Sequence, residues 1–197
     1  RDVTRLGASE RDVSMVFQSY ALFPHMSVLE NVAYGLRRSG LAKVGAEKCA
    51  QEGLEQVGLK GYSARQPSEL SGGQQQRVAV ARALVLKPSV LLFDEPLSNL
   101  DARLRRQMRE EIRELQQRLG LTVVYVTHDQ QEALTMSDRL AVFHRGSIVQ
   151  VGSPAAVYEH PATAFVAGFV GNSNIYGDES ARRSFGARGR IAIRPER

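Results

Sequence analysis

The sequence contains almost no cysteine and no long apolar run. Cys49 is the single cysteine among 197 residues, which excludes an internal disulfide framework and fits a reducing cytosol. No stretch has the length and apolarity of a membrane-spanning helix, and no secretory signal pattern is present. We therefore expect any membrane association to come through a partner protein.

Long basic runs are also missing, although the formal net charge is +5. Most arginines are interleaved with acidic residues, which is typical of a solvated surface, so we expect no nucleic-acid partner. The 43% hydrophobic content can bury a core, and it predicts one main domain with a small appendage. The chain opens at Arg1 instead of methionine, which suggests a fragment.

Three short apolar runs predict the buried strands of a parallel sheet, because each is continuous and is followed by a helical pattern. They are Val13 to Phe17, Val90 to Phe93 and Thr122 to Thr127. From Asp101 to Leu119, apolar residues recur at helical spacing with charges between them. The last two strands and this helix form a strand, helix, strand unit with an expected right-handed crossover, so the fold class is α/β.

Helical character extends from Ser27 to about Leu86, which is too long for a simple crossover. We therefore predict a helical subdomain, about residues 27–86, inserted into the sheet domain. Pro24 marks its start, and polar residues around Pro67 interrupt it.

The pattern changes after Ser137 to a predicted hairpin, in which Arg145 and Gly146 form the turn. Residues 140–144 and 148–151 are its strands, and 155–159 and 163–170 are helical segments. A Gly, Ser and Arg-rich stretch, 171–189, predicts a linker of low structural content. Residues 190–197 then begin another small element, so the main domain is predicted to span 1–170.

Two carboxylates, Asp94 and Glu95, follow the predicted strand that ends at Phe93. Ligands bind at the carboxyl ends of strands in open α/β sheets. There an aspartate can hold Mg²⁺ on nucleotide phosphates, and a neighbouring glutamate can deprotonate a water. The alternative for an isolated Asp-Glu-Pro is a pair of acids that cap a turn.

The string Ser71, Gly72, Gly73 and Gln74 precedes a helical run rich in alanine and leucine. Ser71 is well placed to cap that helix, and the glycines leave backbone N–H groups open to a phosphate. An ordinary cap is the alternative, but the string that continues through Arg77 is far more specific. Gln18 and His128 end the other two predicted strands, so a polar residue is expected from every strand at one edge of the sheet.

Together these residues resemble the nucleotide-binding subunit of ABC transporters, over nearly the whole chain. LSGGQQQR at Leu70 to Arg77 is similar to the signature motif, and VLLFDEP at Val90 to Pro96 is similar to the Walker B strand. The D-loop, switch histidine and Q-loop glutamine are matched by Ser98 to Asp101, His128 and Gln18. The resemblance implies a P-loop NTPase-type core with an inserted helical signature subdomain and the start of an accessory β-domain.

The resemblance implies a head-to-tail dimer that closes around two ATP molecules with Mg²⁺. Asp94 would help hold Mg²⁺, Glu95 would be the general base, and His128 would contact the γ-phosphate. Gln18 would sense metal and water and connect the site to the membrane partner. Ser71 and Gly73 would reach the γ-phosphate bound by the opposite subunit, and Asp101 would communicate across the dimer. Gly72 and Gln74, in the same turn, are further predicted cofactor-binding residues.

A phosphate-binding loop of the pattern Gly, four residues, Gly, Lys and Ser or Thr is missing. The nearest string, Gly35 to Gly40, lacks the lysine and the hydroxyl and falls in the helical subdomain. In the family this loop lies upstream of Gln18, so we expect an N-terminally truncated chain with little or no ATPase activity alone. A start codon just before Arg1 would instead favour a non-catalytic regulatory piece.

Tyr20 to Leu36 resembles the region of importer ATPases that receives the permease, although its apolar residues can equally pack the subdomain core. Gly152 to Phe169 and Ile193 to Glu196 resemble the branch that serves polyamine, ferric iron, sugar and related solutes; the polyamine or ferric iron group is favoured. The implied partners are permease subunits, a second copy and, indirectly, a solute-binding protein, at the cytoplasmic face of the inner membrane. A soluble ABC ATPase acting on nucleic acid or ribosomes is the alternative.

Overall fold

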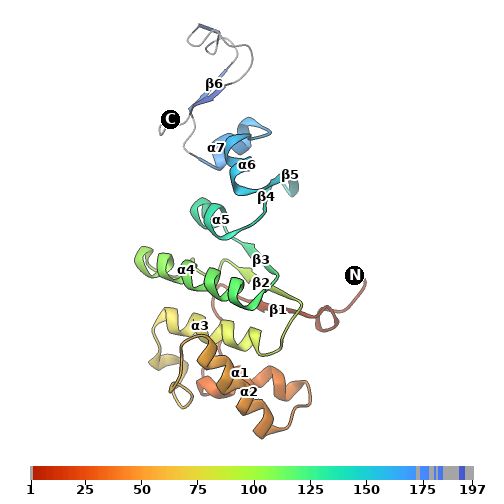
Figure 1. Ribbon diagram of the computed structural model, residues 1–197, viewed down its shortest axis with the longest axis vertical. Helices are drawn as coiled ribbons and strands as arrows, with labels where there is room; N and C mark the ends of the chain where they lie inside the picture. Colours follow the sequence, from red (N-terminus) through yellow and green to blue (C-terminus); the bar gives the residue numbers. More distant parts are fainter. Residues whose placement is uncertain (1, 172–173, 178–179, 181, 184–190, 194–197) are drawn as a thin grey trace. The chain divides into compact units, whose positions relative to one another are not determined.

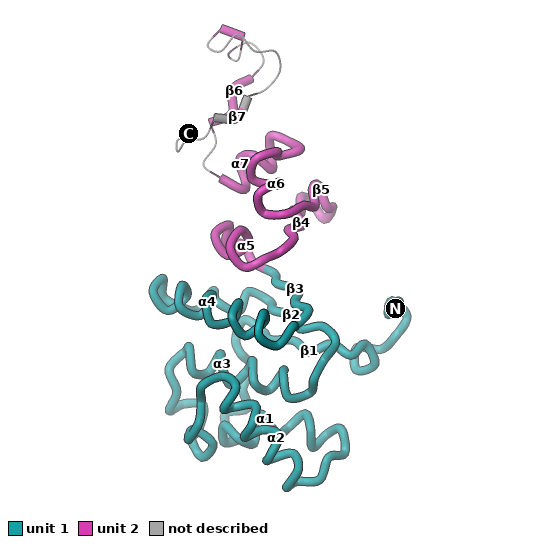
Figure 2. Tube along the Cα trace, viewed as in Figure 1, with its two compact units in different colours: residues 1–126 teal, residues 127–197 magenta. Residues whose placement is uncertain are grey.

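The computed structural model describes residues 2–171, 174–177, 180, 182–183 and 191–193. The chain forms two compact units, Arg1–Val126 and Thr127–Arg197 (Figure 2). The sequence instead predicted a main domain ending at residue 170, and that domain division stays a prediction.

A parallel three-stranded sheet is the centre of the first unit. Its strands are β1 (Val13–Val16), β2 (Val90–Asp94) and β3 (Val123–Val126), in the order β1-β2-β3. Val16 pairs with Phe93, and Asp94 pairs with Val126. The parallel α/β sheet predicted from the apolar runs is therefore confirmed, with strands β1 and β3 slightly shorter than expected. A short 3-10 turn, Ala8–Glu10, precedes β1.

Helix α4 (Ala102–Leu119) connects β2 to β3. Asp101 caps its first turn, and Gly120 ends it in the left-handed conformation with φ of 61°, which glycine adopts without a steric penalty. The helix buries one face through Met108, Ile112 and Leu115, because these residues recur at helical spacing.

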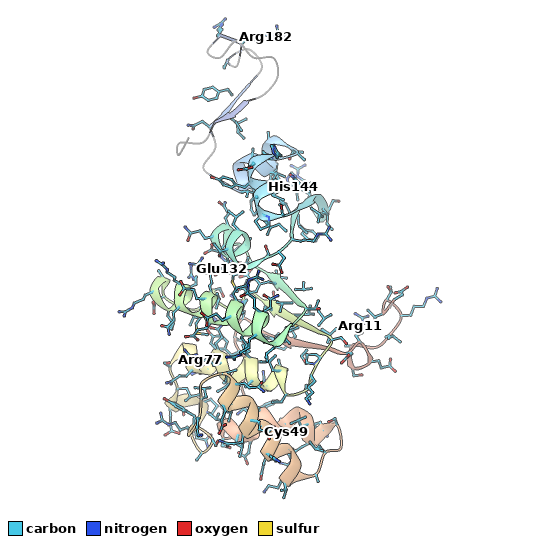
Figure 3. The ribbon with its side chains drawn as sticks, in the orientation of Figure 1. Arg11, Cys49, Arg77, Glu132, His144 and Arg182 are labelled. Carbon is cyan, nitrogen blue, oxygen red and sulfur yellow. The ribbon has the colours of Figure 1, made fainter. Side chains whose placement is uncertain are left out.

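The helices predicted between residues 27 and 86 form one group in the first unit (Figure 1). They are α1 (Val28–Arg38), α2 (Lys43–Gln56) and α3 (Gly72–Leu84), with a 3-10 turn at Pro67–Glu69. Helix α3 packs against α1, α2 and strand β1, so it connects this group to the sheet. Cys49 lies on α2, partly buried against the core of the group (Figure 3). That core contains Val28, Val32, Ala33, Leu36, Ala46, Ala50, Leu54, Leu59, Leu70, Val78 and Ala81.

The second unit begins with α5 (Gln130–Met136), followed by a hairpin of β4 (Leu140–His144) and β5 (Ser147–Gly152). Arg145 and Gly146 form its turn with φ of 50° and 78°, as a tight hairpin requires. Helices α6 (Pro154–Glu159) and α7 (Ala164–Phe169) follow. The predicted hairpin and both helical segments are therefore present, around a core of Val142, Val157, Val166 and Val170.

Residues 174–176 of the predicted linker, 171–189, form a strand, and the linker assignment stays a prediction. Strand β6 (Asn174–Tyr176) pairs antiparallel with β7 (Ile191–Ile193). Ile and Tyr favour extended backbone, but three residues among glycines and arginines are too few to give a pattern. The parts of the linker at 172–173, 178–179, 181 and 184–189 lie outside the described residues. Of the small element predicted at 190–197, residues 190 and 194–197 lie outside them too. None of the described helices combines the length and apolarity that crossing a bilayer requires.

Candidate active site

The ends of β1 and β2 bring three predicted site residues to one edge of the sheet. Val16 pairs with Phe93 in parallel register, so Gln18 follows β1 at the same edge where Asp94 ends β2 and Glu95 follows it. Gln18 is exposed, whereas both carboxylates are half-buried. This edge is the carboxyl end of a parallel sheet, where α/β proteins bind ligands.

Glu95 has a strained backbone. Its φ is 44°, a left-handed conformation that is uncommon for a residue with a side chain and that concentrates at functional sites. The Glu95 N–H donates to the Val126 carbonyl at 3.0 Å, and the Ser98 hydroxyl donates to the Glu95 carbonyl at 2.9 Å. Pro96 and Leu97 are buried directly after it. The strained backbone is therefore held by hydrogen bonds to both the N–H and the carbonyl of Glu95, and by burial of the next two residues.

Asn99 connects the carboxylate turn to the Gln18 segment. Its side-chain amide donates to the Gln18 carbonyl at 2.9 Å. Sequence reasoning placed Asn99 in a loop motif but missed this bond, because the two residues are far apart in the chain. The bond fixes the backbone that carries the Gln18 side chain.

Asp101 is the N-cap of α4. Its carboxylate accepts from the Leu104 N–H at 2.9 Å, which satisfies one of the free donors of the first helical turn. Arg105 donates to the carbonyls of Leu97 at 3.3 Å and Leu100 at 3.0 Å. The turn between Glu95 and α4 is thus held from the helix, and no sequence signal singled out Arg105. A role of Asp101 across a dimer stays a prediction.

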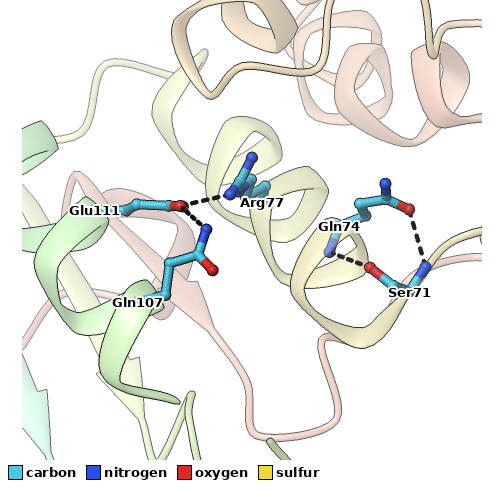
Figure 4. A network of polar contacts seen from close by, with 5 residues as sticks. All are labelled: Ser71, Gln74, Arg77, Gln107 and Glu111. Carbon is cyan, nitrogen blue, oxygen red and sulfur yellow. Dashed lines mark hydrogen bonds and ion pairs between the residues drawn. The ribbon is translucent and has the colours of Figure 1, made fainter. Parts of the chain in front are cut away.

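Ser71 caps α3 as the sequence predicted. Its hydroxyl accepts from the Gln74 N–H at 3.4 Å, and the Gln74 side chain accepts from the Ser71 N–H at 3.0 Å (Figure 4). These reciprocal bonds form a capping box. Ser71 is exposed, so the turn is accessible to an approaching group.

The two glycines after Ser71 have a packing role that the sequence did not indicate. A Cβ on Gly73 would lie 3.2 Å from the Leu104 Cδ1 atom, and one on Gly72 would lie 3.3 Å from the Leu100 Cδ2 atom. Both distances are tighter than ordinary van der Waals contact. The turn therefore packs closely on the start of α4, in addition to presenting backbone N–H groups.

An ion pair also connects α3 to α4. The Arg77 guanidinium lies 2.6 Å from a Glu111 carboxylate oxygen, and that oxygen also accepts from the Gln107 side chain at 2.8 Å (Figure 4). Both charged side chains are half-buried, and hydrogen bonds between two charged groups are stronger than those between neutral ones. The signature-like turn and the turn after Glu95 therefore belong to helices that are packed and ion-paired to each other.

His128 belongs to the second unit, where it is exposed. Its neighbours form a tight turn: the Asp129 N–H donates to the Thr127 hydroxyl at 3.0 Å, and Asp129 caps α5. The Thr127 hydroxyl donates at 2.7 Å to Glu132, a buried carboxylate that the sequence analysis did not single out. The placement of His128 beside Asp94 stays a prediction.

The residues at the sheet edge suit Mg²⁺ held partly by phosphate oxygens. Within the described ranges, no three His, Cys, Asp or Glu side chains are grouped to hold a metal by themselves. Mg²⁺ characteristically uses one or two carboxylates with water and substrate phosphates, and the half-buried Asp94 can supply one of them. Gly35, by contrast, lies inside α1 with Leu86 against it, which supports rejecting Gly35 to Gly40 as a phosphate loop.

Comparison with known proteins gives consistent matches. The ABC transporter family model matches residues 1–98. The "Fe(3+) ions import ATP-binding protein FbpC" of Agrobacterium fabrum is 64% identical, over 93% of this chain and 54% of that protein. The protein of the same name from Brucella melitensis is 69% identical, over 89% and 50%. The "Uncharacterized ABC transporter ATP-binding protein YdcT" of Escherichia coli is 58% identical, over 95% and 56%. The chain spans about half the length of these curated relatives.

Proposed function

Because this chain belongs to the ABC transporter family, we propose that the full-length protein is the ATP-hydrolysing subunit of an importer. The observation that carries the proposal is the position of Gln18, Asp94 and Glu95 at one edge of a parallel sheet. The exposed Ser71 turn, at the head of a helix in the same unit, supports a second contact with nucleotide. Neither feature alone is specific to ATP hydrolysis, since acidic residues before a proline are common, and so are serine caps.

In the proposed reaction, Glu95 accepts a proton from a water while the water oxygen attacks the γ-phosphorus. The bond from that phosphorus to the bridging oxygen breaks, and ADP and inorganic phosphate leave. Mg²⁺, when bound, neutralises phosphate charge, and Asp94 would hold it. Gln18 would orient the water and metal, and His128 would contact the γ-phosphate. The strained backbone of Glu95 supports this role, because such conformations concentrate at functional sites.

A second copy completes the proposed site. Ser71, Gly72, Gly73 and Gln74 would reach the γ-phosphate held by the opposite copy, and Asp101 would communicate between the two. The backbone N–H groups of Gly72 and Gly73, which are not part of the capping box, and the positive dipole end of α3 support phosphate binding there. The permease would contact the segment from Tyr20 to Leu36, which gives a peripheral location on the cytoplasmic face of the membrane and an indirect link to a solute-binding protein.

Ferric iron is the solute that we propose first. Relatives with 64% and 69% identity carry the name of Fe(3+) import proteins. Uptake of labelled ferric iron should be restored when the full-length gene is returned to cells that lack it. If uptake of a polyamine or a sugar is restored and uptake of iron is not, ferric iron is not the solute. Copurification with RNA in place of a permease would favour the soluble alternative.

The assignment of the base is tested with Glu95→Gln in the full-length protein. The amide cannot accept the proton, so steady-state hydrolysis should fall by about 10²- to 10⁴-fold while ATP binding is retained. Glu110→Gln, an exposed carboxylate on α4, is the matched control and should hydrolyse normally. Unchanged turnover in Glu95→Gln would remove Glu95 as the base.

The role of the Ser71 turn is tested by dimer formation. With Glu95→Gln present, ATP should convert the protein to a dimer on size-exclusion chromatography. Adding Ser71→Arg should prevent this conversion, because the long side chain occupies the place of the phosphate. Ala64→Arg, at another exposed residue of the same unit, should not. An ATP-dependent dimer that survives Ser71→Arg would contradict the proposed contact.

A further inference from the structure

The segment after Gln18 has an unusual backbone. Tyr20 and Ala21 have φ of 60° and 47°, so two consecutive residues with side chains adopt the left-handed conformation. The left-handed form is sterically unfavourable for residues with a side chain. Tyr20 is also buried, with 6% of its surface exposed, and burial raises the pKa of its hydroxyl. Such a conformation persists only where surrounding groups hold it.

Arg82, from the last turns of α3, bonds to this strained pair. Its Nη1 atom donates to the Ala21 carbonyl at 2.7 Å, and its Nη2 atom donates to the Tyr20 carbonyl at 2.8 Å. Its guanidinium carbon lies 5.7 Å from the centre of the Phe23 ring, within cation–π range. The planar guanidinium therefore grips two successive carbonyls with charge-assisted bonds, which a lysine cannot reproduce.

Two other side chains bond to the same segment, one before and one after the two residues that Arg82 holds. Asn99 donates to the Gln18 carbonyl at 2.9 Å. Asn31, from α1, accepts from the Phe23 N–H at 2.8 Å and donates to the Met26 carbonyl at 3.1 Å. Of the three side chains that bond to this segment, Arg82 is the one that belongs to α3.

Helix α3 is continuous from Gly72 to Leu84. At 1.5 Å per residue, its Ser71 end and Arg82 are about 16 Å apart along a rigid rod. A displacement of the Ser71 turn therefore displaces Arg82 as well, and with it the two carbonyls that Arg82 holds.

We propose that Arg82 is a positioning residue that transmits the position of α3 to the Gln18 to Ser27 segment. The inference rests on the proposed function, in which one end of α3 meets nucleotide and this segment faces the permease. In the proposed function Arg82 has no contact with the nucleotide or the attacking water, because its guanidinium is bonded to the Tyr20 and Ala21 carbonyls. It acts by keeping the Tyr20 and Ala21 backbone attached to the helix that carries the Ser71 turn.

Hydrogen exchange tests the attachment in the full-length protein without any need for activity. The Tyr20 N–H donates to the Phe17 carbonyl at 2.9 Å, so its exchange reports the local conformation. In Arg82→Met this amide should exchange about ten-fold faster or more, the effect of losing a charge-assisted bond. The amides of α3 should keep their protection. Arg106→Met, at an exposed arginine of α4, is the control and should change neither.

If Arg82→Met unfolds the unit, the conservative variant Arg82→Lys provides the test. A lysine keeps the charge but not the fork, so Tyr20 should still exchange faster while α3 stays protected. Unchanged Tyr20 exchange in Arg82→Lys, or in a folded Arg82→Met, would overturn the proposal.

A kinetic measurement separates transmission from mere structural support. With the permease present, kcat of the stimulated hydrolysis should fall about ten-fold in Arg82→Lys, a loss comparable to one hydrogen bond. KM for ATP should stay within about two-fold, since ground-state nucleotide binding is unaffected. An equal fall in basal and stimulated kcat would overturn transmission. Absence of any hydrolysis by the unsubstituted protein would instead refute the proposed function and leave the exchange result standing.

Discussion

At the scale of single residues, polar side chains determine the backbone of the segment before α1. Asn31 is fully buried and makes four bonds to the turn that precedes its helix. Its amide oxygen accepts from the Phe23 N–H, and its amide nitrogen donates to the carbonyls of Phe23, Met26 and Ser27 at 3.1, 3.1 and 3.0 Å. A buried amide with this many partners is worth more to stability than an exposed one.

Asn31→Ala should therefore lower the free energy of unfolding by about 2–4 kcal/mol, because several buried backbone groups lose their partners. Urea denaturation followed by circular dichroism measures the change. Asn99→Ala is the matched control: that amide is exposed and makes a single bond to Gln18, so its loss should stay below about 1 kcal/mol. Equal losses in the two variants would contradict the prediction.

At the scale of elements, the helical group depends on close approach of α2 and α3. A Cβ atom on Gly53 of α2 would overlap the Val85 Cγ1 atom at the end of α3. Gly45, on the same helix, has only Leu41 nearby, at 3.5 Å or more. The same residue type therefore serves packing at one position and has no such role at the other.

Gly53→Ala should destabilise the protein by about 1–3 kcal/mol, because overpacking outweighs the better helix propensity of alanine. Gly45→Ala should instead stabilise it by up to about 1 kcal/mol, since propensity acts there without a clash. Thermal unfolding of both variants gives the comparison. The same sign of change in both would show that contact with Val85 does not decide the outcome.

At the scale of the whole molecule, one face of the parallel sheet remains apolar and open in this chain. Met15, Leu92 and Val124 lie side by side in the strand register. Met15 and Val124 are 37% and 49% exposed. A contiguous apolar patch differs from a scattered exposed residue, because it can bind apolar molecules.

The 197-residue chain should therefore bind an apolar fluorescent dye such as ANS. The double variant Met15→Thr and Val124→Thr should reduce the fluorescence by roughly half or more, because it interrupts the patch. Val44→Thr changes an isolated exposed valine on α2 and should have little effect. Equal reductions would place the dye elsewhere.

The sequence by itself was sufficient for the elements that depend on local pattern. Continuous apolar runs predicted β1, β2 and β3, and helical spacing predicted α4. Ser71 was recognisable as the cap of α3, since capping is a local interaction of three or four residues, whereas Asp101 was predicted as the first helical residue and is the N-cap of α4. The parallel arrangement also followed, and with it the meeting of Gln18 and Asp94 at one sheet edge.

Only the tertiary structure decided the features that join distant parts of the chain. The left-handed Tyr20 and Ala21 carry no turn signal of glycine or proline, and Arg82 holds them from more than sixty residues away in sequence. The packing of Gly72 and Gly73 on Leu100 and Leu104 likewise joins α3 to the turn before α4 and to α4 itself. Local periodicity reports which face of an element is buried, but it does not report what lies against that face. The contacts that position the site depend on what lies against each buried face, so they became visible only in three dimensions.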